Sequence, residues 1–367
     1  MSSRLAVVVA RLQEHRVPFE TIEVGPGAVI LVSAYGGRVY GPFFDGGVAE
    51  NWLPDAFASP SDFAALVSSG FWNVGGDRMW IGPEIAYMIP ERSDYWGSYT
   101  MPADIDPGEN TLSRDSAGVS VRRGIRARSF VSPGSVALDL TTTVRAAASP
   151  LRNLRSGLDP SAVSYGGYTV TARLEVADDS DSGLEVESWM LNQVRPGGTA
   201  IVPGTRVQVT DYYEPVGALL AERGGHVAVS LTGAQRFKIG FSAPTVFGRM
   251  GYLRDDPDGA AVLVVRNSLS DASAEYAEEP DFAVGRRGDS LHLYNDDGGL
   301  GGFAELEARG LPIRSGTPGT SSTTDRFTSW WFRGEASAVR DIAAVLLGAG
   351  AQEHHRPERP PGKKDAS

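Results

Sequence analysis

The clearest pattern in the chain is an alternation of apolar and polar residues with a period of two. It runs through residues 136–144 and 168–176 and returns in shorter form at 207–209 and 227–231. Successive side chains of a strand point to opposite faces of a sheet, so each segment is expected to be a strand with one buried face. Residues 261–265 are apolar throughout, which is typical of a strand covered on both faces.

Turn signals separate these segments. The chain contains 44 glycines and 23 prolines, and 41% of its residues are hydrophobic, which is enough for a large core. Many short strands with little helix between them favour an antiparallel β-sandwich over alternating βαβ units. The sequence therefore predicts an all-β fold, with residues 21–350 forming a single domain.

Helical periodicity is confined to a few places. Residues 1–20 carry apolar side chains at helical spacing and are expected to pack on the main domain as an amphipathic helix. A C-terminal helix is predicted over 337–347, and a short helix over 61–69 that begins at Ser61. The tail at 351–367 is rich in proline and charge, so we expect disorder there and no metal site at its two histidines.

Composition narrows the possible partners. The net charge is −11 and the body of the chain has no basic block, so nucleic acid is not an expected partner. No run of about eighteen apolar residues exists, and the N-terminus lacks a signal-peptide pattern, so we expect a soluble protein with no membrane contact. The absence of cysteine excludes disulfides and thiolate ligands and fits a cytoplasmic location. No cofactor and no metal are expected.

Three loops resemble ligand sites only superficially. Residues 178–183 and 255–259 are acidic, but neither has the spacing of a calcium loop. Residues 298–302 are rich in glycine, and a phosphate cradle would require a helix after them. A strand is expected there instead. All three are predicted to be ordinary turns or loops.

Residues 73–84 are the most unusual stretch. Two glycines and a proline accompany planar polar side chains and an indole, an equipment suited to sugar hydroxyls and to the C–H face of a sugar ring. The alternative is a buried structural ion pair that fixes the turn, with the indole in the core, and the segment alone does not decide between them. The binding candidates in it are Asn73, Asp77, Arg78, Trp80 and Glu84.

The following segment, 85–99, is rich in aromatic residues. It is expected to be either a loop that covers the core or an aromatic wall of a binding site. Tyr95 and Trp96 join the binding candidates on the second interpretation.

Two glutamates form a second constellation. Glu305 and Glu307 stand two apart on a predicted strand, so both face the same side of a sheet. Neighbouring carboxylates shift each other's proton affinity, and such pairs are frequent in functional clefts. The structural alternative pairs one of them with Arg78 or Arg309. If the partner is Arg78, both constellations belong to one cleft.

At these places the chain resembles the galactose-mutarotase-like superfamily, in particular an uncharacterised branch with a Gly-Gly-Asp-Arg-x-Trp-x-x-Pro-Glu element. The similarity spans roughly residues 22–335. It rests on the following segments: Gly36-Gly37-Arg38-Val39, residues 75–84, Trp189 with Pro196-Gly197-Gly198, residues 236–241, and Glu305-Leu306-Glu307.

The resemblance implies a large antiparallel β-supersandwich of galactose-mutarotase type, with short flanking helices at both ends, whose concave face binds a small carbohydrate. In aldose 1-epimerases a glutamate removes the proton of the anomeric hydroxyl while a histidine protonates the ring oxygen. Glu307 matches the base best, with Glu305 as the substitute if the register differs by one pair.

The histidine half of that pair is missing from its expected motifs. Of the five histidines, His292 is the one that could approach the cleft, against the plainer expectation of a surface residue at a strand edge. Arg78, Tyr87 or Tyr95 are the other candidates for a proton donor or an electrostatic clamp, although arginine stays protonated.

The sequence thus predicts a carbohydrate-recognising mutarotase-like protein, either a divergent sugar epimerase or isomerase acting at the anomeric centre or a non-catalytic binder. A glycoside hydrolase or lyase-associated domain is a second class, with Glu84 and Glu307 as its carboxylate pair. A purely structural or partner-binding sandwich is a third class. In it the side chains of Arg78 and Glu307 would be buried, their polar groups would be paired with each other, and there would be no open cavity. The identity of the sugar and the number of subunits are left open.

Overall fold

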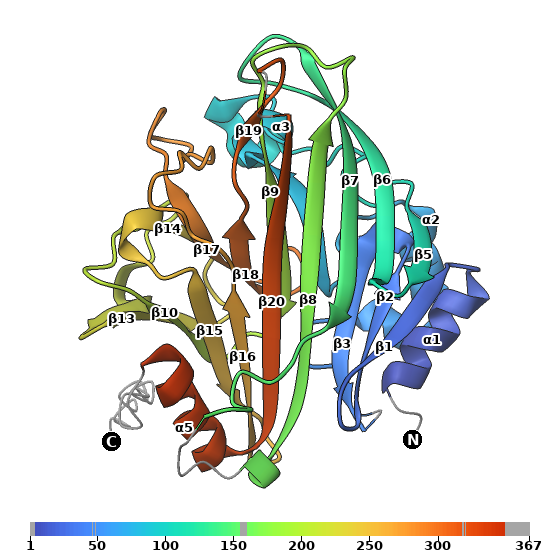
Figure 1. Ribbon diagram of the computed structural model, residues 1–367, viewed down its shortest axis with the longest axis vertical. Coiled ribbons are helices and arrows are strands. Elements are labelled where there is room, and N and C mark those ends of the chain that lie inside the picture. Colours follow the sequence, from blue (N-terminus) through green and yellow to red (C-terminus); the bar gives the residue numbers. More distant parts are fainter. Residues whose placement is uncertain are drawn as a thin grey trace, which may run out of the picture.

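The structure, a computed structural model, describes residues 4–45, 47, 49–154, 160–317, 319 and 321–348. The predicted tail at 351–367 lies outside the described residues. Two ten-stranded antiparallel sheets form the body of the molecule (Figure 1), as the sequence predicts.

The two sheets draw their strands from along the whole chain. In spatial order, sheet A contains β1 (Phe19–Gly25), β2 (Ala28–Ser33), β3 (Arg38–Phe44), β4 (Asp77–Gly82), β9 (Glu185–Val194), β18 (Ala304–Arg309), β17 (Asp289–Asn295), β14 (Phe237–Ser242) and β11 (Val209–Asp211), with β19 (Ile313–Arg314) paired to β9. Sheet B contains β12 (Leu220–Arg223), β13 (His226–Leu231), β10 (Gly198–Pro203), β15 (Arg249–Asp255), β16 (Ala260–Asn267), β20 (Ser322–Glu335), β8 (Val163–Val176), β7 (Ser135–Ala146), β6 (Gly118–Arg128) and β5 (Thr111–Asp115).

Five short α-helices surround the sheets in this part of the chain: α1 (Arg4–Glu14), α2 (Pro60–Ser68), α3 (Glu84–Tyr87), α4 (Tyr95–Ser98) and α5 (Ala336–Leu347). The two terminal helices are those predicted. Val8 and Leu12 of α1 pack with Phe57 and Phe63 in a small separate core. None of the described helices is both long enough and apolar enough to cross a membrane.

The apolar pattern of the strands matches their burial. On β7, Val136 and Leu138 are buried whereas Asp139 is exposed. On β16 both faces are covered, because Val264 lies in the core between the sheets and Leu263 lies under α5. These strand predictions are confirmed.

The helix α2 begins at Pro60, one residue before the predicted start at Ser61. The cap is Ser59, whose hydroxyl accepts the N–H of Asp62 at 3.3 Å, and Pro60 follows as the first helical residue. The sequence pattern did not indicate Ser59 as the cap, because the proline that follows it suggests a helix break. Proline is nevertheless favoured at the first helical position.

Replacing Ser59 with Ala is expected to lower the free energy of unfolding by about 1 kcal/mol, because the first turn of α2 loses its cap. Urea unfolding measures the change. Ser68→Ala, at the other end of α2, is the matched control, since its hydroxyl donates to the Ala64 carbonyl at 2.7 Å and does not cap the first turn. An equal loss in that variant would contradict the assignment.

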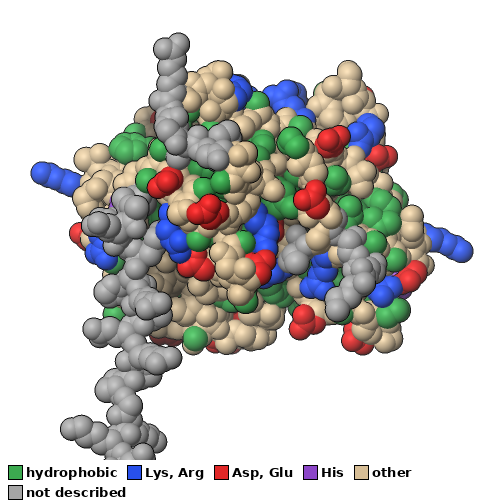
Figure 2. All heavy atoms as spheres, turned by 90° about the horizontal axis from the view of Figure 1, so that it is seen from below, with side chains coloured by type: hydrophobic (Ala, Val, Ile, Leu, Met, Phe, Trp, Pro, Cys, Tyr) green, Lys and Arg blue, Asp and Glu red, His purple; other side chains and the backbone are tan. Residues whose placement is uncertain are grey.

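The two faces of sheet A differ in character, because one packs against sheet B and the other points away from it. On β18, Leu306 and Ala308 pack into the core between the sheets, so Glu305 and Glu307 point away from sheet B. The charge on the remaining surface is mixed: acidic and basic side chains are interspersed on the face that Figure 2 shows.

Register then aligns polar residues on the outer face of sheet A. Lys238 of β14 pairs with Tyr294 of β17. Tyr294 in turn pairs with Glu305 of β18, and Glu305 pairs with Gln193 of β9. Side chains at directly paired positions share a face, so four strands contribute neighbouring groups to one place.

Candidate functional site

A cavity of about 280 Å³ lies over this outer face of sheet A. Residues from both of the constellations found in the sequence meet in it. Its lining combines aromatic rings with three acids and three cations: Trp72, Arg78, Trp80, Glu84, Trp96, Tyr99, Trp189, Tyr213, Arg236, Lys238, Tyr294, Leu300, Phe303, Glu305 and Glu307.

Two glycines bring the first wall into place. Gly75 and Gly76 both have φ of 80°, a conformation that side chains disfavour, and a Cβ on Gly75 would lie 2.6 Å from the carbonyl oxygen of Trp52. The chain then enters β4, whose alternation turns Arg78 and Trp80 towards the cavity.

The same alternation turns Asp77 the other way, which corrects its assignment as a binding residue. Its carboxylate accepts from the Tyr168 hydroxyl at 2.8 Å and pairs with Arg266 at 2.9 Å, both in sheet B. Asp77 therefore ties the two sheets together and does not reach the cavity. The physical reason is that residues 77 and 78 are neighbours in a strand and not in a turn.

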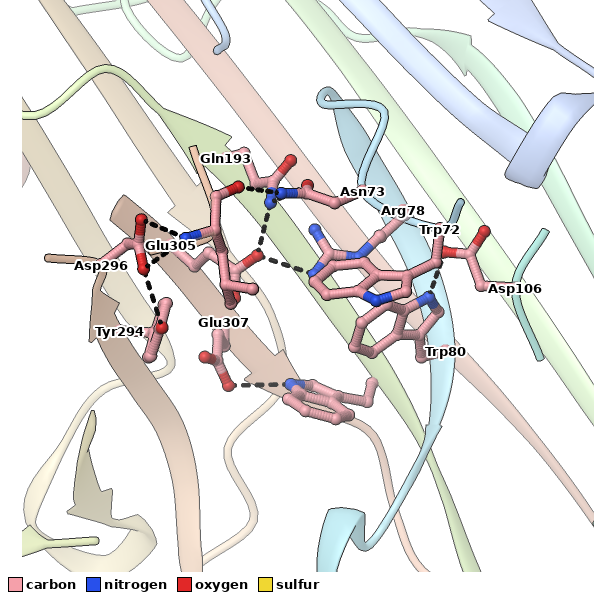
Figure 3. Close-up of polar contacts among 12 residues, drawn as sticks. Trp72, Asn73, Arg78, Trp80, Asp106, Gln193, Tyr294, Asp296, Glu305 and Glu307 are labelled. Carbon is pink, nitrogen blue, oxygen red and sulfur yellow. Dashed lines mark hydrogen bonds and ion pairs between the residues drawn. The ribbon is translucent and has the colours of Figure 1, made fainter. Parts of the chain in front are cut away.

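Arg78 and Glu305 form the first ion pair of the cavity (Figure 3). Arg78 Nη2 lies 2.7 Å from Glu305 Oε1, which also accepts from Gln193 Nε2 at 3.0 Å. The guanidinium lies over the ring of Trp80 at 4.1 Å and that of Trp72 at 5.4 Å. Among the described residues nothing accepts a hydrogen bond from Arg78 Nε or Nη1. Both atoms are buried, so they face the protein and not the open cavity.

Glu307 lies deeper, with 1% of its surface exposed. Its Oε2 accepts from the indole N–H of Trp189 at 2.9 Å and lies 3.7 Å from Lys238 Nζ. Burial raises the pKa of Glu307 to about 7, since the opposing attraction of Lys238 only partly offsets the desolvation of the carboxylate. A carboxyl group with such a pKa is suited to exchange protons at neutral pH.

Lys238 links Glu307 to Glu84. Its Nζ lies 2.7 Å from Glu84 Oε2, which also accepts from the Tyr213 hydroxyl at 3.1 Å. Burial would lower the pKa of Lys238, but the surrounding carboxylates, Glu307 first, outweigh it and raise the pKa. The pKa of Glu84 is lowered, because Lys238 outweighs the effect of burial. The pair is therefore ionised.

The remaining predicted binding residues take different places. Trp96 is 41% exposed at the mouth of the cavity, with the Arg236 guanidinium 4.7 Å from its ring centre. Tyr95 stands behind the wall, its hydroxyl 2.9 Å from that of Tyr213. Asn73 accepts from Gln193 at 2.9 Å and donates to the carbonyl of Leu300 at 2.7 Å, so it braces the wall from outside.

His292 is buried and not a surface residue. It pairs with Glu307 across β17 and β18, and its ring packs edge-on against Tyr212 at 5.0 Å. It is not among the cavity-lining residues, and burial lowers its pKa well below 6.5, with Arg309 and Lys238 adding to the effect. Within the described chain neither ring nitrogen has a hydrogen-bond partner. A neutral, covered imidazole is poorly placed to protonate a ligand in the cavity.

Both interpretations of segment 85–99 hold for different residues. Tyr87 is buried and its hydroxyl donates to the carbonyl of Glu185 at 2.7 Å, so it is a core residue. Trp96 and Tyr99 line the cavity.

The glycine-rich segment 298–302 is a loop, as predicted. It is pinned by Asp296, which accepts from the backbone N–H of Gly302 at 2.9 Å.

Sequence reasoning missed several cavity residues, above all Lys238, Tyr213 and Trp72, and also Gln193, which donates to Glu305 from behind the lining. Lys238 had a usable signal, because it is the sole lysine before residue 363 and stands two residues from Arg236 on a strand. Gln193 and Tyr213 had no local signal, because their partners lie more than a hundred residues away in the chain. Trp72 lies next to the segment 73–84 and contacts Arg78, so it could have been included with that segment.

Solved structures of other proteins share the fold of this chain. No family model matches the chain, and no curated protein matches it by sequence. A crystal structure of a protein from Klebsiella pneumoniae, provisionally assigned as an aldose 1-epimerase, matches 95% of this chain and 88% of its own with a TM-score of 0.51 and 10% identity. The chain therefore has the galactose-mutarotase-like β-supersandwich fold, as the resemblance predicts.

Two further structures match less closely. One is a provisionally assigned aldose 1-epimerase from Escherichia coli, with 14% identity, a TM-score of 0.47 and coverage of 86% of this chain and 99% of its own. The other is a galactose 1-epimerase from Lactobacillus acidophilus, with 13% identity, a TM-score of 0.36 and coverage of 87% and 99%.

Proposed function

We propose that the cavity on sheet A binds a neutral sugar and that Glu307 acts there as general base on the anomeric hydroxyl. The observation that carries the proposal is Glu307 itself, a buried carboxyl at the cavity wall with a pKa raised to about 7 and an indole N–H holding its Oε2. Such a group is half ionised near neutrality and can both accept and return a proton.

The rest of the lining supports sugar recognition. The half-buried ring of Trp72 and the exposed ring of Trp96 line the cavity and suit the C–H side of a sugar ring. The carboxylates of Glu305 and Glu307 can accept hydrogen bonds from sugar hydroxyls. Pockets that mix apolar walls with a few fixed polar groups are typical of small-molecule sites.

Charge balance favours a neutral ligand over a sugar phosphate. Each cation that lines the cavity already has an acidic partner within 3.0 Å: Arg78 with Glu305, Lys238 with Glu84, and Arg236 with Asp297. A phosphate would have to displace one of these partners. For the two buried pairs, Arg78–Glu305 and Lys238–Glu84, the cost of leaving the carboxylate unpaired argues against that exchange.

Two of the alternative classes lose support. A hydrolase needs its two carboxylates on either side of a glycosidic bond, but Lys238 Nζ occupies the space between Glu84 and Glu307, 2.7 Å from one and 3.7 Å from the other. A purely structural role does not account for a cavity of about 280 Å³ lined by aromatic rings and by Glu307.

Sugar binding without turnover is the second candidate. It is favoured by the position of His292, which is covered, so the residues lining the cavity include no histidine to serve as the acid. A cytoplasmic location and the single-domain organisation of residues 21–350 stay proposals from the sequence.

A thermal-shift screen against aldoses and their phosphates tests the binding proposal. A ligand that binds the folded state alone stabilises it by about 2.7 kcal/mol at a hundred times its Kd. We expect at least one neutral monosaccharide to raise the melting temperature, and its phosphate to do so less. Stabilisation by phosphates alone would overturn the assignment of a neutral ligand.

The rate of anomer interconversion is expected to rise with pH through about 7 and then level off, because the base form of Glu307 is the carboxylate and burial raises its pKa. Below this pH the group is protonated and cannot accept the anomeric proton. Polarimetry across the pH range measures the midpoint. A midpoint near 4.5, the ordinary value for a glutamate, would contradict the assignment of Glu307 as the base.

A further inference from the structure

Lysine is almost absent from this chain. The sequence has 34 lysine and arginine residues together, and the lysines among them are Lys238, Lys363 and Lys364. The other cations in and under the cavity, Arg78, Arg236 and Arg309, are arginines. Apart from the two lysines of the tail, the single lysine of this chain lies in the cavity wall, whereas the other cations there are arginines. Lysine and arginine differ in their acid–base chemistry. Arginine holds its proton, whereas lysine can release one.

We propose that Lys238 is the proton donor to the ring oxygen, the second half of the acid–base pair whose histidine is missing. This inference rests on the proposed function. Its basis is geometric: Nζ lies 3.7 Å from the Oε2 of Glu307, lines the same cavity, and is held 2.7 Å from Glu84. The anomeric oxygen and the ring oxygen are bonded to one carbon, so acid and base must stand this close together.

The reaction balances with these two groups. Glu307 takes the proton of the anomeric hydroxyl, the C1–O1 bond becomes a carbonyl, and the C1–O5 bond breaks with its electron pair on O5. Lys238 gives O5 a proton and becomes a neutral amine. After rotation about C1–C2, O5 returns that proton to Lys238 and attacks the other face of C1, while O1 takes back the proton held by Glu307. No other reactant is consumed.

The surroundings suit this role. An alkoxide is a much stronger base than an amine, so a lysine with a raised pKa still protonates it. Glu84 favours the return of the proton from O5 to Lys238, because it stabilises the ammonium by a direct contact. The charged or titratable groups that face Lys238 are Glu84 at the start of α3, Glu307 and Arg309 on β18, His292 on β17, Glu278 in the segment before β17, and Tyr212 directly after β11.

Other donors are less suited. His292 is covered and its pKa lies well below its ordinary value because of burial. Tyr213 donates its one hydroxyl proton to Glu84 at 3.1 Å, whereas the ammonium of Lys238 has further N–H groups besides the one that faces Glu84. Arg78 is bound to Glu305 and keeps its proton.

The test compares Lys238→Met and Lys238→Arg by exchange NMR on the sugar that the wild-type protein interconverts. We expect both to lose about 100-fold or more in kcat. The pH profiles of the two variants distinguish the loss of the proton that Lys238 donates from the loss of its positive charge. In Lys238→Met the midpoint moves above 7, because Lys238 holds down the pKa of Glu307, whereas Lys238→Arg keeps the charge and the midpoint.

Controls keep the result interpretable. Lys238→Met together with Glu84→Gln removes the pair as a whole, so a folded variant is obtained even if the single change is unstable. Arg249→Met, which removes a partly buried cation 5.8 Å over Trp330 and away from the cavity, should leave the rate unchanged.

Each outcome decides the matter. A Lys238→Arg variant with wild-type kcat would overturn proton donation and leave the proposed base intact. A wild-type protein that binds sugar without exchanging its anomers would overturn both this inference and the role of Glu307, but not the binding site.

Discussion

Glu307→Gln is expected to slow anomer interconversion by about 100- to 10,000-fold while leaving sugar affinity nearly unchanged. Glutamine has the size of glutamate, and its amide oxygen can still accept the indole N–H that Trp189 now donates to Glu307 at 2.9 Å. What it cannot do is take a proton. The loss should therefore fall on kcat and not on KM.

Polarimetry at a pH above 7 measures this loss, and thermal shift measures binding in the same samples. Glu50→Gln is the matched control, because Glu50 is also a buried glutamate whose pKa burial raises to about 7, but its charged neighbours, Arg333 first, lie outside the cavity lining. Full activity in Glu307→Gln would remove the base from the account, and equal losses in both variants would show a general effect of buried glutamates.

Arg78→Met is expected to abolish sugar binding and to lower the free energy of unfolding by about 3–5 kcal/mol, because Glu305 stays buried without its cation. Glu305 is 5% exposed, and Gln193 alone would remain to donate to it. Adding Glu305→Gln to this variant removes the unpaired charge. Most of the stability should then return, whereas binding should not, since the guanidinium is part of the cavity lining and is still missing.

Denaturant unfolding and calorimetric titration separate these two effects. Arg266→Met is the control: it breaks the pair with Asp77 at 2.9 Å on the opposite face of sheet A, so it should destabilise the protein and spare the sugar site. If sugar affinity fell equally in both variants, loss of binding would follow from instability and Arg78 would not be a binding residue.

Local periodicity was enough to predict much of the fold. The alternation on β7 and β8 and the helical spacing on α5 each follow from which side of one element is buried, a property that the segment itself encodes. The start of α2 was missed because Pro60 separates Ser59 from the rest of the pattern.

The site was predictable only in part, for a different reason. Period two already places Glu305 and Glu307 on one face, and the same rule would have separated Asp77 from Arg78 had residues 77–82 been assigned to a strand. Gly75 and Gly76 made the segment look like a turn. The contact between Arg78 and Glu305 depends on the order of β4, β9 and β18, and no local pattern encodes which strands become neighbours.

Exchange NMR on the anomers of neutral aldoses, with the wild-type protein about one unit above the pKa of Glu307, tests the central claim most directly. The account predicts that at least one aldose that raises the melting temperature also interconverts faster than in buffer, in proportion to protein concentration. Occupancy of the cavity by such sugars with no acceleration for any of them would contradict the assignment of Glu307 as a catalytic base.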